Sequence, residues 1–182
     1  MAARQPAPGG GAVSAVTVSL AASLVAMAAR YSVDRLDGAD AIVDDAEQLR
    51  TRAAGLADDD AAAYGAVISA YAARREQDGD VQRERVTAAL TRAAEVPLEI
   101  AAVAAEITGL ASRLRVDGKA DVRGDATTAL LLADAATRAA AHLVTANVEA
   151  GGGDADLARR AMESVATSRT AASGAELPNP RL

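Results

Sequence analysis

A run of three glycines followed by an uncharged stretch constrains the fold more than any other feature of this sequence. Gly9, Gly10 and Gly11 precede the segment 12–29, which contains no charge, no glycine and no proline. Because its residues are apolar or small on every side, we expect a helix that is buried on every side. Glycines suit places where the backbone turns tightly or approaches another group closely. A helix that starts there aims free N–H groups and its positive dipole end at an anion or a carbonyl oxygen.

Two other interpretations of this segment remain to be weighed. A glycine-rich start is also typical of a chain end without fixed structure. The segment 12–29 is barely long enough to span a membrane, and it is rich in Ala, Ser and Thr rather than Leu. A secretory signal places basic residues directly before the apolar run, whereas here only Arg4 precedes it and Pro-Gly-Gly-Gly intervenes. We therefore expect a core helix in a cytoplasmic protein, with no membrane partner.

The composition favours closely packed helices. The 182 residues suggest one domain, over 1–172, followed by a disordered tail over 173–182. Hydrophobic residues make up 51% of the chain but aromatic residues only 2%, with no Phe and no Trp. A core of Ala, Val, Leu and Ile fills little volume per side chain, so its elements must approach closely. Helices do so more readily than the sheets of a sandwich or barrel.

Composition also excludes several kinds of chemistry. There is no Cys, so thiolate catalysis and disulfides are excluded, and the one His, His142, argues against a zinc site built from several imidazoles. We therefore expect no metal site. The net charge of −6 and the lack of a basic stripe with aromatics argue against a nucleic-acid partner. The residue types alone do not reveal a catalytic set.

Beyond Tyr31, apolar residues recur at three- and four-residue spacing, which predicts helices. The acidic run Asp58–Asp60 is typical of a solvated helix start, and Pro97 should kink or restart a helix. The expected helices run from Ala39 to the acidic run, over 61–75, from Val81 to Leu114, over 120–148 until the glycines 151–153, and over 154–168.

These elements predict an all-α fold, an up-and-down bundle of five to six helices. We expect the alanine- and leucine-rich stretch 126–141 to lie beside the first helix. Two helices that are apolar on all sides, here 12–29 and 126–141, exceed what one small bundle needs to bury. The sequence therefore predicts a homodimer.

Four stretches, taken together, resemble one protein family. The first, 6–15, contains Pro-Ala-Pro-Gly-Gly-Gly-Ala-Val, and the second, 60–64, is Asp-Ala-Ala-Ala-Tyr. The third, 94–99, contains Val-Pro-Leu-Glu. The fourth, 125–147, begins Asp-Ala-Thr-Thr-Ala-Leu and ends at an Asn. The order and spacing are similar to those of the cyclodeaminase/cyclohydrolase family over about residues 6 to 165. That family comprises the cyclodeaminase domain of formiminotransferase-cyclodeaminase and bacterial methenyl-tetrahydrofolate cyclohydrolases.

The resemblance implies a homodimer that acts on a folate one-carbon unit without a metal or redox cofactor. It either hydrolyses methenyl-tetrahydrofolate to formyl-tetrahydrofolate or cyclises formimino-tetrahydrofolate with loss of ammonia. By resemblance, Asp125 is the catalytic acid, with an ordinary helix N-cap as its alternative role. Substrate binding falls to the N–H groups of the three glycines, Gly9, Gly10 and Gly11, and to Asn147 for the pterin. Lys119 and Arg123 are expected to meet the glutamate carboxylates of the substrate.

The sequence also departs from the family pattern at polar positions. Ala12 replaces a Ser after the glycines, Gly124 replaces the Ser before Asp125, and Leu143 replaces an Asn. Each change removes a polar group from the expected site. A second hypothesis is therefore a diverged, non-catalytic helical dimer that binds a small anionic ligand or a partner protein.

Overall fold

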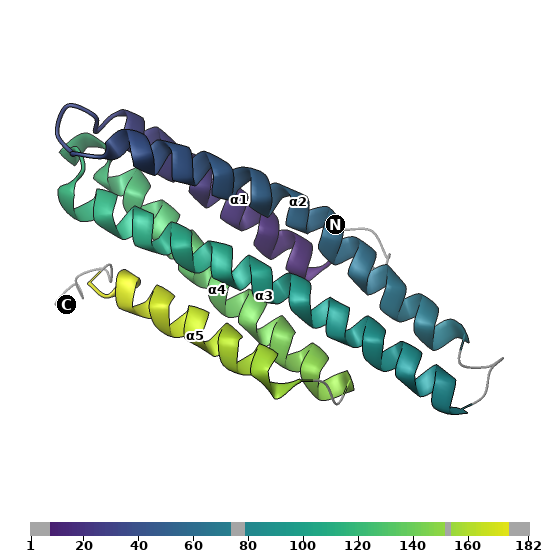
Figure 1. Cartoon of the computed structure of the whole chain (residues 1–182). Helices are drawn as coiled ribbons and strands as arrows, with labels where there is room; N and C mark the ends of the chain where they lie inside the picture. Colours follow the sequence, from purple (N-terminus) through teal and green to yellow (C-terminus); the bar gives the residue numbers. More distant parts are fainter. Residues whose placement is uncertain (1–7, 74–78, 152–153, 175–182) are drawn as a thin grey trace, which may run out of the picture.

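The computed structural model describes residues 8–73, 79–151 and 154–174, and within these ranges every regular element is a helix, without a strand. Five α-helices and one 3₁₀ turn follow one another along the chain (Figure 1). This confirms the all-helical fold with five helices. The elements are α1 (Gly10–Arg30), α2 (Ala39–Ala72), α3 (Gly79–Asp117), η2 (Ala120–Val122), α4 (Arg123–Gly151) and α5 (Ala155–Ala172).

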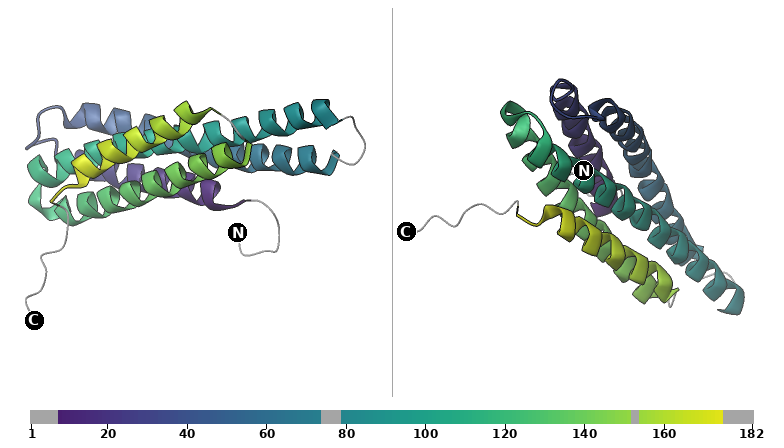
Figure 2. Two further views of the ribbon diagram at one scale, coloured as in Figure 1. Left: turned by 90° about the horizontal axis from the view of Figure 1, so that it is seen from below. Right: turned by 60° about the vertical axis from the view of Figure 1, so that its left-hand side comes forward.

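Helix α1 lies within the bundle, in contact with α2, α3 and α4. Helix α5 packs against α3 and α4 on the other side, as the views of Figure 2 show. The hairpin of α2 and α3 extends past the start of α1 (Figure 1). At that end the bundle therefore has fewer helices than in its middle.

The core is built mostly from alanine, as the composition predicts. Helix α4 contributes Ala126, Ala129, Ala133 and Ala140, all fully buried, to the same cluster as the alanines of α1. The expectation that the stretch 126–141 lies beside the first helix is confirmed. Small side chains allow the helix axes to approach closely, so that packing extends along the helix length.

The prediction that the first helix is buried on every side is wrong for the single chain. Val13, Val16 and Leu20 have exposed fractions of 44%, 39% and 59%. Their spacing of three and four residues places them on one face of α1. Helix α1 also has the length and composition of a membrane-spanning segment, but 56% of that stretch is buried inside the bundle, as in the core helix of a globular domain.

The predicted break at Asp58–Asp60 is wrong, because α2 runs without interruption from Ala39 to Ala72. Asp58 and Asp59 are exposed on the surface, while Asp60 is half-buried. Buried Leu56 and Ala63 flank the acidic run and pack into the core. Tertiary packing of that face outweighs the poor helix propensity of three aspartates. The helix begins after Gly38, whose φ is 78°, and no side chain caps it by a hydrogen bond.

Helix α3 likewise continues through Pro97, so of the two predicted effects of this residue the restart is wrong, while a kink stays a prediction. The last two helices follow the prediction more closely. Helix α4 ends at Gly151, the first residue of the second glycine run, and Asp154 caps α5 by accepting a hydrogen bond from the N–H of Asp156 at 2.8 Å. Disorder over 173–182 stays a prediction, since most of that segment lies outside the described residues.

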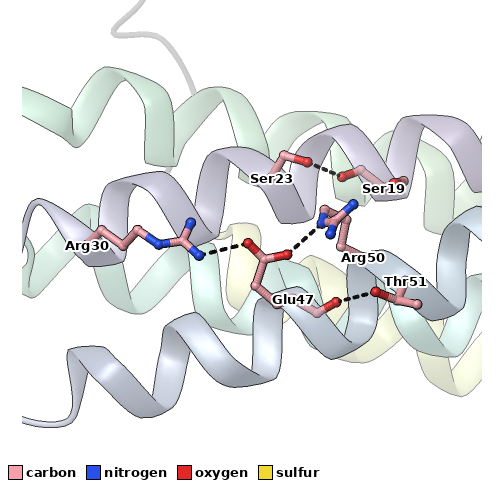
Figure 3. Close-up of polar contacts among 6 residues, drawn as sticks. All are labelled: Ser19, Ser23, Arg30, Glu47, Arg50 and Thr51. Atoms are coloured by element: carbon pink, nitrogen blue, oxygen red, sulfur yellow. Dashed lines mark hydrogen bonds and ion pairs between the residues drawn. The ribbon is translucent and has the colours of Figure 1, made fainter.

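An exposed carboxylate joins the end of α1 to α2. Glu47 accepts hydrogen bonds from Arg30 at 2.9 Å and from Arg50 at 2.7 Å (Figure 3). These bonds, first from Arg30 and then from Arg50, hold the pKa of Glu47 below its ordinary value. Exposed ion pairs of this kind contribute little to stability. The contact therefore adds little to the packing of α1 against α2, which the alanine core already holds together.

Candidate functional site

A cavity of about 260 Å³ lies where α1 begins. Its walls come from the first turn of α1, the middle of α2, the proline turn of α3 and the C-terminal half of α4. The lining residues are Gly9, Gly10, Gly11, Asp60, Ala63, Tyr64, Ala93, Pro97, Leu143 and Asn147. Mostly apolar walls with a few convergent polar groups are typical of small-molecule sites.

The first turn of α1 presents backbone donors to this cavity. Gly9 is the N-cap residue and has no side chain to cap the helix. The N–H groups of Gly10 and Gly11 have no hydrogen-bond acceptor among the described residues. The third N–H, that of Ala12, donates to Oδ2 of Asp60 at 2.9 Å. Two free donors at the positive end of a helix dipole can bind an anionic or carbonyl oxygen.

Asp60 approaches α1 closely because Gly11 has no side chain. A Cβ atom at Gly11 would lie 1.9 Å from Oδ1 of Asp60, well inside van der Waals contact. The expectation that another group approaches the glycine backbone closely is therefore confirmed at Gly11. The glycines do not form a loop, however, because Gly10 and Gly11 are the first residues of α1. A long-range contact, which the local sequence does not reveal, stabilises helical glycines here.

The pKa of Asp60 is raised above its ordinary value because burial disfavours the charged carboxylate, and the bond from the Ala12 N–H opposes this only in part. A half-buried carboxyl group with a raised pKa holds a proton more readily than an exposed one, which suits it to take a proton and pass it on. Its position in a cavity beside two free N–H donors makes it the strongest candidate for proton transfer.

The proline turn of α3 supplies the second polar feature. Pro97 has no N–H, so the buried carbonyl of Ala93, four residues earlier, lacks its usual helical donor. The side chain of Asn147 on α4 replaces that donor, with Nδ2 at 2.7 Å from the Ala93 oxygen. An unpaired buried carbonyl would cost roughly 1–3 kcal/mol. Asn147 therefore joins α4 to α3 at the cavity wall.

Comparison with known proteins adds the decisive observation. The sequence profile described as formiminotransferase-cyclodeaminase matches residues 1–167. The chain belongs to this family. This confirms the resemblance seen in the four sequence stretches.

Two relatives of the formiminotransferase-cyclodeaminase family illustrate the likeness. A methenyltetrahydrofolate cyclohydrolase of Methylorubrum extorquens is 29% identical over 157 residues, which cover 82% of this chain and 76% of the relative. The crystal structure of formiminotetrahydrofolate cyclodeaminase from Thermotoga maritima aligns with a TM-score of 0.80 at 24% identity. That alignment covers 96% of this chain and 86% of the other, so the two share one fold.

The structure gathers part of the site expected from the family resemblance. Gly9, Gly10, Gly11 and Asn147 line the same cavity. One amide hydrogen of Asn147 is already engaged by Ala93, which leaves its other hydrogen and its oxygen for a ligand. The assigned roles in binding stay predictions.

The remaining expected residues lie at the other end of the bundle. The N–H of Lys119 donates to Oγ of Ser32, just beyond the C-terminal end of α1, at 3.0 Å. Arg123 begins α4 there, and Asp125 is in the first turn of α4 rather than at the N-cap. The length of α1, about 30 Å for a helix of 21 residues, separates this end from the glycines. One chain therefore does not bring Asp125, Lys119 and Arg123 to the cavity.

The sequence interpretation missed Asp60 as a site residue. It grouped Asp60 with two exposed aspartates as a solvated helix start. A signal was present, because Asp60 and Tyr64 belong to one of the four family stretches. At a spacing of four residues they share a helix face, and both line the cavity.

Proposed function

We propose that the cavity at the start of α1 binds a tetrahydrofolate one-carbon derivative and that the chain acts on that carbon. Membership of the formiminotransferase-cyclodeaminase family supports this proposal, as do the activities for which the two relatives are named. The observation that carries it is the half-buried carboxyl of Asp60 beside the free N–H groups of Gly10 and Gly11.

For methenyl-tetrahydrofolate, the reaction needs a base and then an acid. The methenyl carbon is cationic and electrophilic, so it needs no metal to polarise it. Asp60 takes a proton from water as the oxygen bonds to that carbon, and the free N–H groups stabilise the oxygen. Asp60 then returns the proton to the ring nitrogen as the carbon–nitrogen bond breaks. The added hydroxyl loses its own proton to solvent, which leaves the formyl product.

For formimino-tetrahydrofolate, the same groups serve a cyclisation. The second folate nitrogen attacks the carbon of the protonated formimino group and loses its own proton to Asp60, which leaves a neutral amino group on that carbon. The amino group of the resulting tetrahedral carbon takes that proton and leaves as ammonia. Both reactions need one carboxyl that changes protonation state, so the site chemistry suits either.

Two assays with one pair of variants test the proposal. Purified protein is incubated with methenyl-tetrahydrofolate, whose absorbance decay is followed, and with formimino-tetrahydrofolate, from which ammonia release is followed. We expect acceleration over buffer in one assay and a loss of at least about 100-fold in Asp60→Asn. Asp59→Asn, a change at the exposed neighbour, should leave the rate intact.

The departures from the family pattern favour a second candidate, a non-catalytic helical dimer that binds an anionic ligand. In the structure, Leu143 occupies a cavity wall where the family pattern has an Asn, and Gly10 lies against it. Calorimetric titration with a folate distinguishes the two. Folate binding without turnover in either assay supports this candidate, while turnover that depends on Asp60 excludes it.

We propose further that a second copy of the chain covers the exposed face of α1 formed by Val13, Val16 and Leu20, to give a homodimer. An antiparallel pairing of that face opposes the two helix dipoles. It also carries the far end of one protomer, with Lys119, Arg123 and Asp125, toward the cavity of its partner. The predicted roles of these residues then require the dimer.

Mixing two inactive variants tests this arrangement. Asp60→Asn and Asp125→Ala are each purified, mixed, allowed to exchange subunits and assayed. If each site draws on both protomers, mixed dimers contain one intact site and recover part of the wild-type rate. If the mixture is no more active than its components although exchange is complete, the shared site is excluded.

We further propose that the enzyme is cytoplasmic.

A further inference from the structure

The cavity contains a polar contact whose arrangement depends on a proline. The carbonyl of Ala93 and the ring of Pro97 lie on one turn of α3, and both residues are buried. Asn147 reaches this turn from α4, 54 residues away in sequence, and its Nδ2 donates to the Ala93 oxygen at 2.7 Å. The three residues all line the cavity at the start of α1.

This contact settles the orientation of the Asn147 amide. A side-chain amide can generally turn so that its oxygen and nitrogen exchange places. Here the facing group is a carbonyl oxygen, which can only accept a hydrogen bond, so the nitrogen must face it. The oxygen of Asn147 has no donor among the described residues and is not buried away from solvent. The Asn147 oxygen is therefore a hydrogen-bond acceptor held in one orientation at the cavity wall.

We propose that Pro97 is a positioning residue that acts through Asn147. Because Pro97 has no N–H, the Ala93 carbonyl is left to accept a hydrogen bond from the Asn147 amide nitrogen. The amide oxygen then faces away from that carbonyl and can accept a hydrogen bond from a ligand N–H or from water. An ordinary residue at this position supplies an N–H that competes for the Ala93 carbonyl. The amide is then free to turn and to present its nitrogen instead.

The first test reads the contact itself and does not depend on any activity. In a ¹⁵N-resolved NMR spectrum, the two side-chain amide hydrogens of Asn147 should differ strongly in shift, with one protected from solvent exchange. In Pro97→Ala that protection should fall at least about tenfold, because the backbone donor competes. If protection is unchanged in Pro97→Ala, the Ala93 carbonyl serves both donors and the proposal is overturned.

A stability cycle gives the same answer by another route. Asn147→Asp places an acceptor against the Ala93 carbonyl and should lower Tm by several degrees. Adding Pro97→Ala should recover most of that loss, because the carbonyl then has its own backbone donor and the α4 side chain no longer has to supply one. An equal loss of Tm in both backgrounds would contradict the proposed link between the two residues.

A kinetic cycle connects the contact to catalysis and rests on the proposed function. Pro97→Ala and Asn147→Ala should each lower kcat/KM about tenfold, and the double variant should be no worse than Asn147→Ala. Ile100→Val, a fully buried change on α3 outside the cavity, controls for loosened packing and should leave kcat/KM unchanged. Additive losses would overturn the positioning role. If no variant of the protein has activity, the proposed function fails while the NMR and Tm results still decide the contact.

Discussion

The carboxylate of Asp60, in the middle of α2, accepts a 2.9 Å hydrogen bond from the backbone N–H of Ala12 in the first turn of α1. An acid thus caps a helical turn that lies 48 residues earlier in the chain. The carboxyl is also half-buried, and this burial raises its pKa, which the bond from Ala12 opposes only in part. Helix stabilisation and proton-transfer chemistry therefore depend on one side chain.

The raised pKa of Asp60 predicts a specific pH dependence of stability. A carboxyl whose folded pKa lies above its unfolded pKa contributes stability that is present below the unfolded value, about 3.9, and is lost as pH rises through the folded value. Asp60→Asn removes this loss and can still accept the Ala12 N–H bond. In urea unfolding at a series of pH values, the unfolding free energy of the variant should rise relative to that of the wild type as pH rises. Above the folded pKa the difference should stay constant. Parallel curves for the two proteins would contradict a raised pKa.

The close approach at Gly11 predicts a loss of stability on adding one methyl group. In Gly11→Ala the new Cβ overlaps the Asp60 carboxylate, so the Ala12 bond must break or the helices must shift, at a cost of about 1–3 kcal/mol. Gly55→Ala on α2 is the control, because a Cβ there meets nothing within 4 Å. It should raise the unfolding free energy by about 0.5–1 kcal/mol. Equal effects in urea unfolding would show that Asp60 is not held against Gly11.

The exposed face of α1 predicts the effect of a charge on assembly. Leu20→Arg places a cation in the proposed dimer interface and should shift sedimentation from dimer to monomer. Val81→Arg is matched in exposure, at 58% against 59% for Leu20, but lies at the start of α3. It should leave the assembly unchanged. A Leu20→Arg dimer as tight as wild type would place the interface elsewhere.

Treatment with a chelator tests the prediction that no metal takes part. Within the described ranges, no three His, Asp or Glu side chains are grouped as a metal site requires. Dialysis against EDTA should leave the rate with methenyl- or formimino-tetrahydrofolate within twofold of the untreated protein, a criterion of about 0.4 kcal/mol in activation free energy. A larger loss that added metal restores would refute the prediction.

Much of the fold could be predicted because helix periodicity is a local signal. The end of α4 follows Gly151 and the start of α5 follows Asp154, residues whose preferences act within one turn. The continuity of α2 through Asp58–Asp60 could not be predicted in this way, since buried neighbours on the core face hold the helix together across the acids.

The site was harder to predict because its contacts join distant residues. Asn147 was expected in it from the family pattern, but its bond to Ala93 follows from the absence of an N–H at Pro97, an effect of one helix on another. Asp60 has the same residue type as its exposed neighbours Asp58 and Asp59, and it differs from them only in the face of α2 on which it lies. Asp125 shows the opposite case: its sequence context suggested a site, but the fold places it at the far end of the chain's own bundle.

The unequal lengths of the helices give the cavity its place. Helix α1 starts beside Asp60, while α2 continues to Ala72, about 18 Å further along. The cavity therefore lies where α1 stops short of α2 and α3, and Leu143 and Asn147 of α4 complete its wall. The room beside Asp60 is thus set by the residue at which α1 begins, while the buried alanines further along the helices are left as they are.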